Sequence, residues 1–475
     1  MVYSCTFFVC LYTNLTLQTQ GTLGNFNMKY IITNANIVNE GRVFKGTVII
    51  ENCFIKEVIE GDKYISDLSD NEVIDADGKY LIPGIIDDHV HFREPGLTEK
   101  ADIYTESKAA IAGGVTSYME MPNTIPNAVT NQLLEEKYKI ASEKSLANYS
   151  FYIGATNDNL KELTKLNNRN VCGIKVFMGA STGNMIVDDE KILEKIFSLP
   201  LSLIAVHCED EKTINENLEK QKFHFGENIP VYKHPIIRST EACFKSSSYA
   251  VSLATKYNTR LHLLHLTTSK EMELPFSSLP LELKRITSEV CISHLWFCDE
   301  DYKNKYNLIK CNPAIKTAAD RDTLWNALID CRIDVIATDH APHTLTEKNS
   351  SYLKSPSGIP TIQYSLNAML EFVHQKKISI EFIVKKMAHN PAICFGIAKR
   401  GFIRKGYYAD LVLVDMKSQT TVNNSGIFSK CKWSPFEEYT FTSTITHTFI
   451  NGQLVYNNGI FDESKKGMRL EFDRK

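Results

Sequence analysis

Apolar residues recur along the middle of the chain in eight short runs separated by segments with helical spacing. The segments at 104–114 and 188–199 are examples of the helical spacing. Strands that alternate with helices form parallel βα units, and eight units predict a (β/α)₈ barrel of the TIM type over residues 81–395. The runs lie at 80–91, 116–123, 150–156, 172–179, 201–210, 261–268, 286–295 and 334–343.

Both ends of the chain show short alternating strands instead. "KYIITNANIV", "GTVII" and "FIKEVIE" lie near the start, and "ADLVLVD", "STITHTFING" and "QLVYNNG" lie near the end. These strands predict that residues 28–80 and 396–475 together build one small β-sandwich domain. With the barrel, the whole chain is expected to be an α/β protein. Residues 1–27 lack the pattern, and no Lys or Arg precedes their apolar patch, which is a poor fit to a secretory signal. We expect a disordered or mis-assigned extension there, with Met28 as the functional start.

Composition excludes several classes of partner. Hydrophobic residues make up 43% of the chain and charged residues 23%, with a net charge of −3, so neither nucleic acid nor an anionic membrane is the expected partner. No uninterrupted apolar stretch reaches the ~18 residues of a membrane helix. Twelve cysteines without CxxC pairs predict reduced thiols and a cytoplasmic location.

Polar residues stand at or near the carboxyl end of six of the eight runs. In chain order they are His, Asn, Lys, His, His and Asp. The carboxyl ends of barrel strands converge on one face, where the active sites of such barrels lie. We therefore expect these side chains to share one site.

Histidines are the first candidates for metal ligands. His89 and His91 are two residues apart at a strand end and can project from the same face, which suits two nitrogen ligands on one ion. The alternative is a pair of solvated loop histidines. His207 and His265 end other strands of the same barrel, although a lone histidine in an apolar strand is more often a core residue. His262 is assigned to the core, because strand alternation predicts that it points away from His265.

Asp339 and Lys175 are the other unusual residues. Asp339 stands at the expected end of the eighth strand, where a carboxylate can bind a metal or act as a general base; a helix N-cap is the alternative. Lys175 lies inside the apolar run "CGIKVFMG", where burial would depress its pKa from ~10.4. A neutral amine can take up carbon dioxide to give a carbamate that bridges two cations. Pairing with one acid is the alternative for this lysine.

A serine-hydrolase interpretation competes with the metal site. "GASTG" at 179–183 fits G-x-S-x-G between a strand and a helix, which would make Ser181 a nucleophile. That interpretation leaves the histidines and the lysine unexplained, so a glycine-containing loop is favoured.

Six motifs in order resemble the cyclic amidohydrolases, and specifically the dihydroorotases. They are "LIPGIIDDHVHFREPG", "AAIAGGVTSYMEMPNT", "GIKVFMGASTGNM", "HCED", "HLLHLTTSKE" and "ATDHAPH". The resemblance covers residues 28–460 and implies a binuclear zinc site. It implies that His89, His91 and Asp339 hold one ion, that His207 and His265 hold the other, and that carboxylated Lys175 bridges them.

The resemblance also implies a substrate site. Arg93, Asn123 and His343 would bind the ring carboxylate of dihydroorotate, and Asn312 and Gly358 would contact the ring. The alternative for Arg93 is a surface salt bridge with Glu94 or Glu99. The implied reaction interconverts N-carbamoyl-L-aspartate and dihydroorotate, with Asp339 as the proton carrier. Members of the family are often dimers, so a homodimer is also expected.

Two other functions remain open from the sequence. One is a dihydropyrimidinase, hydantoinase or allantoinase-like enzyme with the same metals. The other is a non-catalytic relative that serves as an assembly partner.

Overall fold

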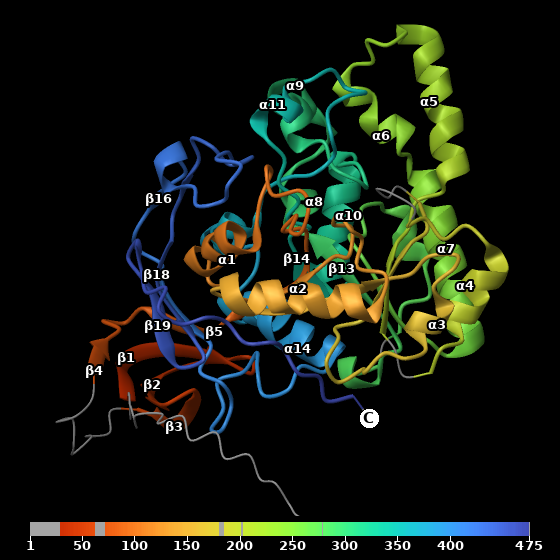
Figure 1. Ribbon diagram of the computed structural model, residues 1–475. Helices are drawn as coiled ribbons and strands as arrows, with labels where there is room; N and C mark the ends of the chain where they lie inside the picture. Colours follow the sequence, from red (N-terminus) through yellow and green to blue (C-terminus); the bar gives the residue numbers. More distant parts are fainter. Residues whose placement is uncertain (1–28, 62–71, 180–184, 201–202, 278, 475) are drawn as a thin grey trace, which may run out of the picture.

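Eight parallel strands form a closed barrel in the computed structural model, which describes residues 29–61, 72–179, 185–200, 203–277 and 279–474 (Figure 1). Parallel pairing joins each strand to the next. A parallel bridge between Val90 and His340 joins the last strand to the first and closes the barrel. In order around the barrel the strands are β6 (Ile85–Val90), β7 (Val115–Glu120), β8 with β9 (Asn148–Phe151 and Ile153–Gly154), β10 (Ile174–Phe177), β11 (Leu203–His207), β12 (Arg260–Leu263), β13 (Ile286–Cys291) and β14 (Val335–Ala337).

Each of the eight predicted runs overlaps one strand of the barrel, which confirms the predicted fold class. Every residue of β6, β7, β10 and β11 is buried, as expected for parallel strands covered on both faces. The first run, however, splits at Gly84. Its residues Tyr80–Pro83 form β5 of a different sheet, so the barrel begins at Ile85 rather than at residue 81. A Cβ at Gly84 would lie 2.1 Å from Thr116 Oγ1, so the strand of the barrel starts where no side chain fits.

Helices follow most of the strands and cover the outside of the barrel. Helix α1 begins with a capping box in which Asp102 and Thr105 each accept from the other's backbone N–H. Helix α7 starts at the N-cap Ser239 and ends at Asn258 in a left-handed conformation. The helices are α1 (Ile103–Ala112), α2 (Asn131–Lys144), α3 (Leu160–Leu163), α4 (Glu190–Phe197), α5 (Glu211–Phe225), α6 (His234–Ile237), α7 (Thr240–Tyr257), α8 (Ile292–Trp296), α9 (Tyr302–Lys305), α10 (Ala318–Ile329), α11 (Leu345–Lys348), α12 (Ser365–His374), α13 (Ile380–Val384) and α14 (Asn390–Phe395).

Both ends of the chain build one further sheet beside the barrel, with red and blue segments adjacent in Figure 1. Strand β15 from the carboxyl-terminal part pairs with β5 from the amino-terminal part, so the two ends are interleaved. Its apolar core includes Ile32, Val48, Leu81, Leu413 and Phe449. The strands run in the order β20 (Ile460–Phe461), β19 (Gln453–Asn457), β18 (Thr444–Ile450), β15 (Leu411–Asp415), β5, β1 (Lys29–Asn39), β2 (Arg42–Glu51) and β3 (Phe54–Glu60), with β4 (Glu72–Asp75) paired to β1. A separate pair joins β16 (Thr420–Thr421) and β17 (Thr440–Phe441).

Two of the sequence predictions fall outside the described residues. They concern the extension at 1–27 with its start at Met28, and the nucleophile interpretation of Ser181. Among the described helices, none has the length and apolar character required to cross a membrane.

Candidate active site

A cavity of about 420 Å³ opens at the carboxyl ends of the barrel strands. It brings together residues from strands that are far apart in the sequence. Its lining contains every residue that the sequence predicted for the site: His89, His91, Arg93, Asn123, Lys175, His207, His265, Asn312, Asp339, His343 and Gly358.

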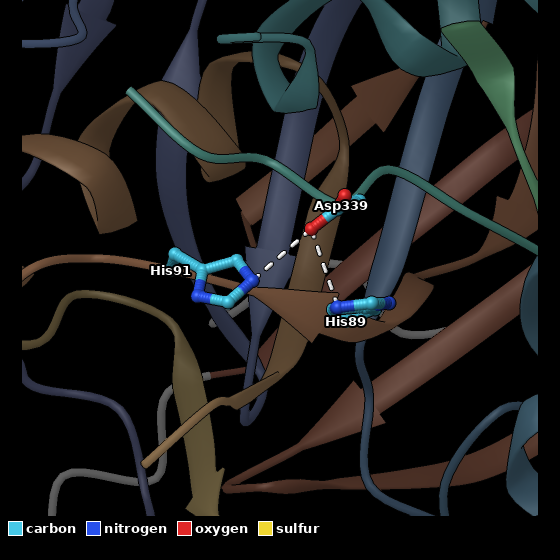
Figure 2. Close-up of side chains that lie close together, drawn as sticks. All are labelled: His89, His91 and Asp339. Carbon is cyan, nitrogen blue, oxygen red and sulfur yellow. Dashed lines mark ion pairs between the residues drawn. The ribbon is translucent and has the colours of Figure 1, made fainter. Parts of the chain in front are cut away.

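Three of these side chains converge on one point (Figure 2). Asp339 Oδ1 lies 3.2 Å from His89 Nε2 and 3.1 Å from His91 Nε2. The other ring nitrogens are already engaged, since His89 Nδ1 lies 2.6 Å from Glu289 Oε1 and His91 Nδ1 lies 2.8 Å from Asn123 Oδ1. With both Nδ1–H groups donating, both Nε2 lone pairs face the carboxylate. This is the arrangement in which outer hydrogen bonds orient metal-binding histidines.

Charge in this cluster also suits a cation. Burial lowers the pKa of His91 to about 4, so its imidazole is neutral near pH 7. Burial would raise the pKa of Asp339, but His89 and His91 outweigh it and hold the pKa below its ordinary value. The pKa of His89 is raised instead, because the charges of Asp339 and Glu289 outweigh its burial. A carboxylate and two imidazoles are a ligand set for a divalent transition metal.

A second cluster lies beside the first. His207 Nδ1 is 2.9 Å from His265 Nε2, and His207 Nε2 is 2.9 Å from Glu209 Oε2. Arg238 forms an ion pair with the same Glu209 carboxylate. Because Nε2–H of His207 donates to Glu209, its Nδ1 carries a lone pair toward His265. The neighbouring His265 Nδ1 is buried and has no hydrogen-bond partner among the described residues.

Lys175 lies between the two clusters on β10 and is 1% exposed. Its Nζ sits 4.5 Å from the centre of the Phe177 ring, and no hydrogen bond or ion pair joins it to any described residue. Burial lowers the pKa of Lys175 to about 7, so a large fraction of the amine is neutral at physiological pH. The alternative of a lysine paired with one acid does not hold within the described part of the chain.

Three site residues have a left-handed backbone. Arg93, His265 and Asp339 have φ values of 69°, 39° and 47°. Such conformations cost roughly 1–3 kcal/mol for residues other than glycine and occur where surrounding structure enforces them. Each of these residues lies two or three positions after the end of a barrel strand, and each side chain lines the cavity at the barrel mouth.

Arg93 forms the cationic side of the cavity. It is 7% exposed, its Nε donates to the Pro342 carbonyl oxygen at 3.1 Å, and its Nη2 lies 3.0 Å from His343 Nε2. Burial lowers the pKa of Arg93 only to about 10, so the guanidinium stays charged. Among the described residues it has no ion pair with Glu94 or Glu99, and Glu94 instead pairs with Lys144. The surface salt-bridge alternative is therefore excluded.

The remaining predicted residues complete the cavity wall. His343 is held by Lys100 and by the Ser357 carbonyl oxygen, and burial lowers its pKa well below the ordinary value. Asn312 Oδ1 is buried and has no hydrogen-bond partner within the described chain. At Gly358, where φ is 151°, a Cβ would lie 2.4 Å from the Ala341 carbonyl oxygen. The backbone can approach the cavity there only without a side chain.

The structure adds residues that the sequence analysis missed. Glu289 and Glu209 orient His89 and His207 from within the runs at 286–295 and 201–210. Each acid stands among other polar residues of its run, so no isolated charge marked it as Lys175 was marked. Asn123, predicted to face the substrate, also fixes His91 through its Oδ1.

His262 is a buried core residue, as predicted, but the expected direction of its side chain was wrong. Its imidazole is fully buried inside the barrel, with Nε2 3.1 Å from Asp88 Oδ2 and 3.4 Å from Glu289 Oε2. Strand β12 ends at Leu263, and His265 has a positive φ, so strand alternation no longer relates the two histidines. Asp339 is also no helix N-cap, because the next helix, α11, is capped by Thr344.

The sequence is similar to one protein family and to several known enzymes. Residues 80–455 match the Amidohydrolase family. The chain is 30% identical to the dihydroorotase of Methanosphaera stadtmanae over 88% of its own length and 95% of the relative's. It is 32% identical to the dihydroorotase of Carboxydothermus hydrogenoformans, over 90% of its own length and 98% of the relative's.

Solved structures of two related proteins share the fold. The L-hydantoinase (dihydropyrimidinase) of Arthrobacter aurescens superposes with a TM-score of 0.84 at 25% identity, covering 91% of this chain and 97% of that one. The dihydropyrimidinase of Brevibacillus agri superposes with a TM-score of 0.84 at 25% identity, covering 94% of this chain and 100% of that one.

Proposed function

The chain belongs to the amidohydrolase family, and on that premise we propose that it is a dihydroorotase. The reaction interconverts N-carbamoyl-L-aspartate with (S)-dihydroorotate and water, a step of pyrimidine nucleotide synthesis. One observation carries this proposal: a buried, charged arginine faces the same cavity as the converging imidazoles and carboxylate. The dihydroorotase relatives named above support it.

Two zinc ions are the proposed cofactors. His89, His91 and Asp339 would hold one ion, and His207 and His265 would hold the other. The fit rests on the convergence of His89, His91 and Asp339, on the contact between His207 and His265, and on the buried His265 Nδ1, which has no hydrogen-bond partner among the described residues. Paired cations in such a site lower the pKa of water and polarise a carbonyl group.

Lys175 would bridge the two ions as a carbamate. Its neutral Nζ forms a bond to the carbon of carbon dioxide and loses one proton, which converts an amine into an anionic carboxylate. The lowered pKa of Lys175 supports this step, because only the neutral amine is nucleophilic.

Asp339 is the proposed proton carrier. Held ionised by His89 and His91, it accepts the proton released when water adds to the ring carbonyl of dihydroorotate. It then delivers that proton to the leaving ring nitrogen. In the direction of ring closure the roles reverse, so Asp339 must begin protonated.

The substrate carboxylate would bind at Arg93. A guanidinium can meet a carboxylate with two parallel N–H groups, and only one of its Nη groups contacts His343. Asn123 donates through its amide nitrogen while its oxygen holds His91. Asn312 and the backbone at Gly358 would contact the ring.

A dihydropyrimidinase or hydantoinase is the second candidate, favoured by the structural likeness to two enzymes of that kind. Dihydrouracil, hydantoin and allantoin lack the ring carboxylate that Arg93 would bind. Assays of these three compounds and dihydroorotate, each with and without a chelator, therefore separate the candidates. We expect chelator-sensitive turnover with dihydroorotate preferred. Preference for hydantoin or dihydrouracil would establish the second candidate, and a metal-free, inactive protein would indicate an assembly role.

The cellular setting follows from the thiols. The cysteines in the described part of the chain are all free, which suits a reducing compartment, and we propose the cytoplasm. A homodimer remains an expectation from the resemblance.

A further inference from the structure

A second group of metal-ligating side chains lies below the cavity, inside the barrel. Asp88 of β6, His262 of β12 and Glu289 of β13 are each 0% exposed. His262 Nε2 lies 3.1 Å from Asp88 Oδ2 and 3.4 Å from Glu289 Oε2. None of the three lines the cavity above.

Four atoms of this group have no hydrogen-bond partner. They are Asp88 Oδ1, Asp88 Oδ2, Glu289 Oε2 and His262 Nε2, all buried. Buried polar atoms are almost always hydrogen-bonded, and an unpaired one costs roughly 1–3 kcal/mol. Three of these atoms, Asp88 Oδ2, Glu289 Oε2 and His262 Nε2, lie together, which indicates a missing common partner.

Hydrogen bonds around His262 fix the orientation of its lone pair. The Thr287 hydroxyl donates to the Leu261 carbonyl oxygen at 3.3 Å, so it accepts from His262 Nδ1–H at 2.8 Å. The remaining nitrogen, Nε2, then presents a lone pair to two carboxylates. This contact is repulsive unless a positive charge lies between them.

Geometry distinguishes a metal ion from a proton at that position. A proton on Nε2 lies along one direction in the ring plane, and neither carboxylate contact meets the geometry of a hydrogen bond. Ligand atoms about 2.1 Å from a tetrahedral ion are separated by about 3.4 Å. The contacts of 3.1 and 3.4 Å match that separation, as do the contacts of Asp339 above.

We infer that Asp88, His262 and Glu289 form a third metal site, which binds a divalent transition-metal ion such as Zn²⁺. Asp88, His262 and Glu289 supply one ligand atom each, which gives three protein ligands. Two carboxylates neutralise the charge of the ion. Thr287 holds the histidine from behind, as outer partners of metal ligands do.

The third ion would tie three barrel strands together below the mouth. Its ligand Glu289 also accepts from His89 Nδ1 through Oε1. The ion would therefore stabilise the barrel interior and fix the carboxylate that orients His89. It contacts no cavity residue directly, so its role is structural and positioning.

Anomalous diffraction on crystals of the full chain, grown without added metal, tests the inference directly. Data above and below the zinc absorption edge should show a peak between Asp88, His262 and Glu289, besides any ions at the mouth. Occupied sites at the mouth with no peak below them would overturn the inference and assign a proton to His262.

Metal analysis of variants provides a second test with a matched control. Asp88→Asn should lower the content by one ion per chain relative to the unaltered protein. Asp87→Asn changes the same residue type one position earlier, where the carboxylate accepts from Thr338, and should keep all ions. Equal loss in both variants, or no loss in Asp88→Asn, would contradict the site. Because the readout is metal, it stands apart from the choice of substrate, which the four-compound assay decides.

Discussion

Replacing Arg93 with methionine removes the positive charge beside the cavity while keeping a side chain of similar length. In the structure this guanidinium is 7% exposed and has no ion pair among the described residues. Its pKa of about 10 keeps it charged at neutral pH. A substrate carboxylate could therefore form a direct ion pair with it, in a buried site with little water to screen the pair.

The expected loss follows from that burial. Truncating one partner of a buried, hydrogen-bonded charge pair costs roughly 2–5 kcal/mol. At about 1.4 kcal/mol for each factor of ten, kcat/KM for dihydroorotate should fall by about 30-fold to about 4,000-fold. Arg93→Lys keeps the charge but loses the planar fork, so its loss should be smaller.

The assay compares dihydroorotate with dihydrouracil, which has the same ring amide but no carboxylate. Arg93→Met should reduce turnover of dihydroorotate selectively and leave any turnover of dihydrouracil nearly unchanged. Equal losses on both compounds would mean that Arg93 supports the site as a whole through Pro342 and His343. Unchanged kinetics on dihydroorotate would refute the assignment of the substrate carboxylate to Arg93.

Other predictions concern the proton carrier, the lysine and the cavity wall. Asp339→Asn should lower kcat by about 10²–10⁴ while elemental analysis still finds bound metal, and full activity would contradict its role. Because the pKa of Asp339 is held low, hydrolysis should persist at mildly acidic pH, whereas ring closure, which needs the protonated acid, should accelerate as pH falls; identical profiles in the two directions would argue against this. Lys175→Met should reduce the metal content, measured by elemental analysis, and a full complement would disprove the bridge. Gly358→Ala should raise KM or lower the melting temperature, because its Cβ would lie 2.4 Å from the Ala341 carbonyl oxygen and 2.8 Å from His343 Cδ2, and wild-type values for both would contradict the tight fit.

The barrel was predictable because burial on both faces leaves its strands as apolar runs. The polar residue at the end of a run marks the site, since parallel strands all end at the same face. His89, Lys175 and Asp339 were identified in this way, and the structure places all three on one cavity.

Residues whose roles depend on packing between strands were not predictable. Glu289 lies in a run with no histidine pattern, and only the closed barrel shows that it reaches both His89 and His262. His262 lies in the core as predicted, but its direction was misjudged because alternation assumes a regular strand, and the positive φ of His265 is a tertiary effect. The break at Gly84 was hidden for a similar reason, since β5 and β6 form one apolar run but belong to different sheets.

The bridge between Val90 and His340 has a consequence for biosynthesis. The two sides of this seam are separated by about 250 residues of chain, and His89 and His91 lie on one side of it with Asp339 on the other. A ribosome therefore completes most of the barrel before the first ligand cluster can exist. Ions bound across the seam would join the two ends of the barrel only late in synthesis. The emerging chain should therefore bind metal only after its eighth barrel strand has been synthesised.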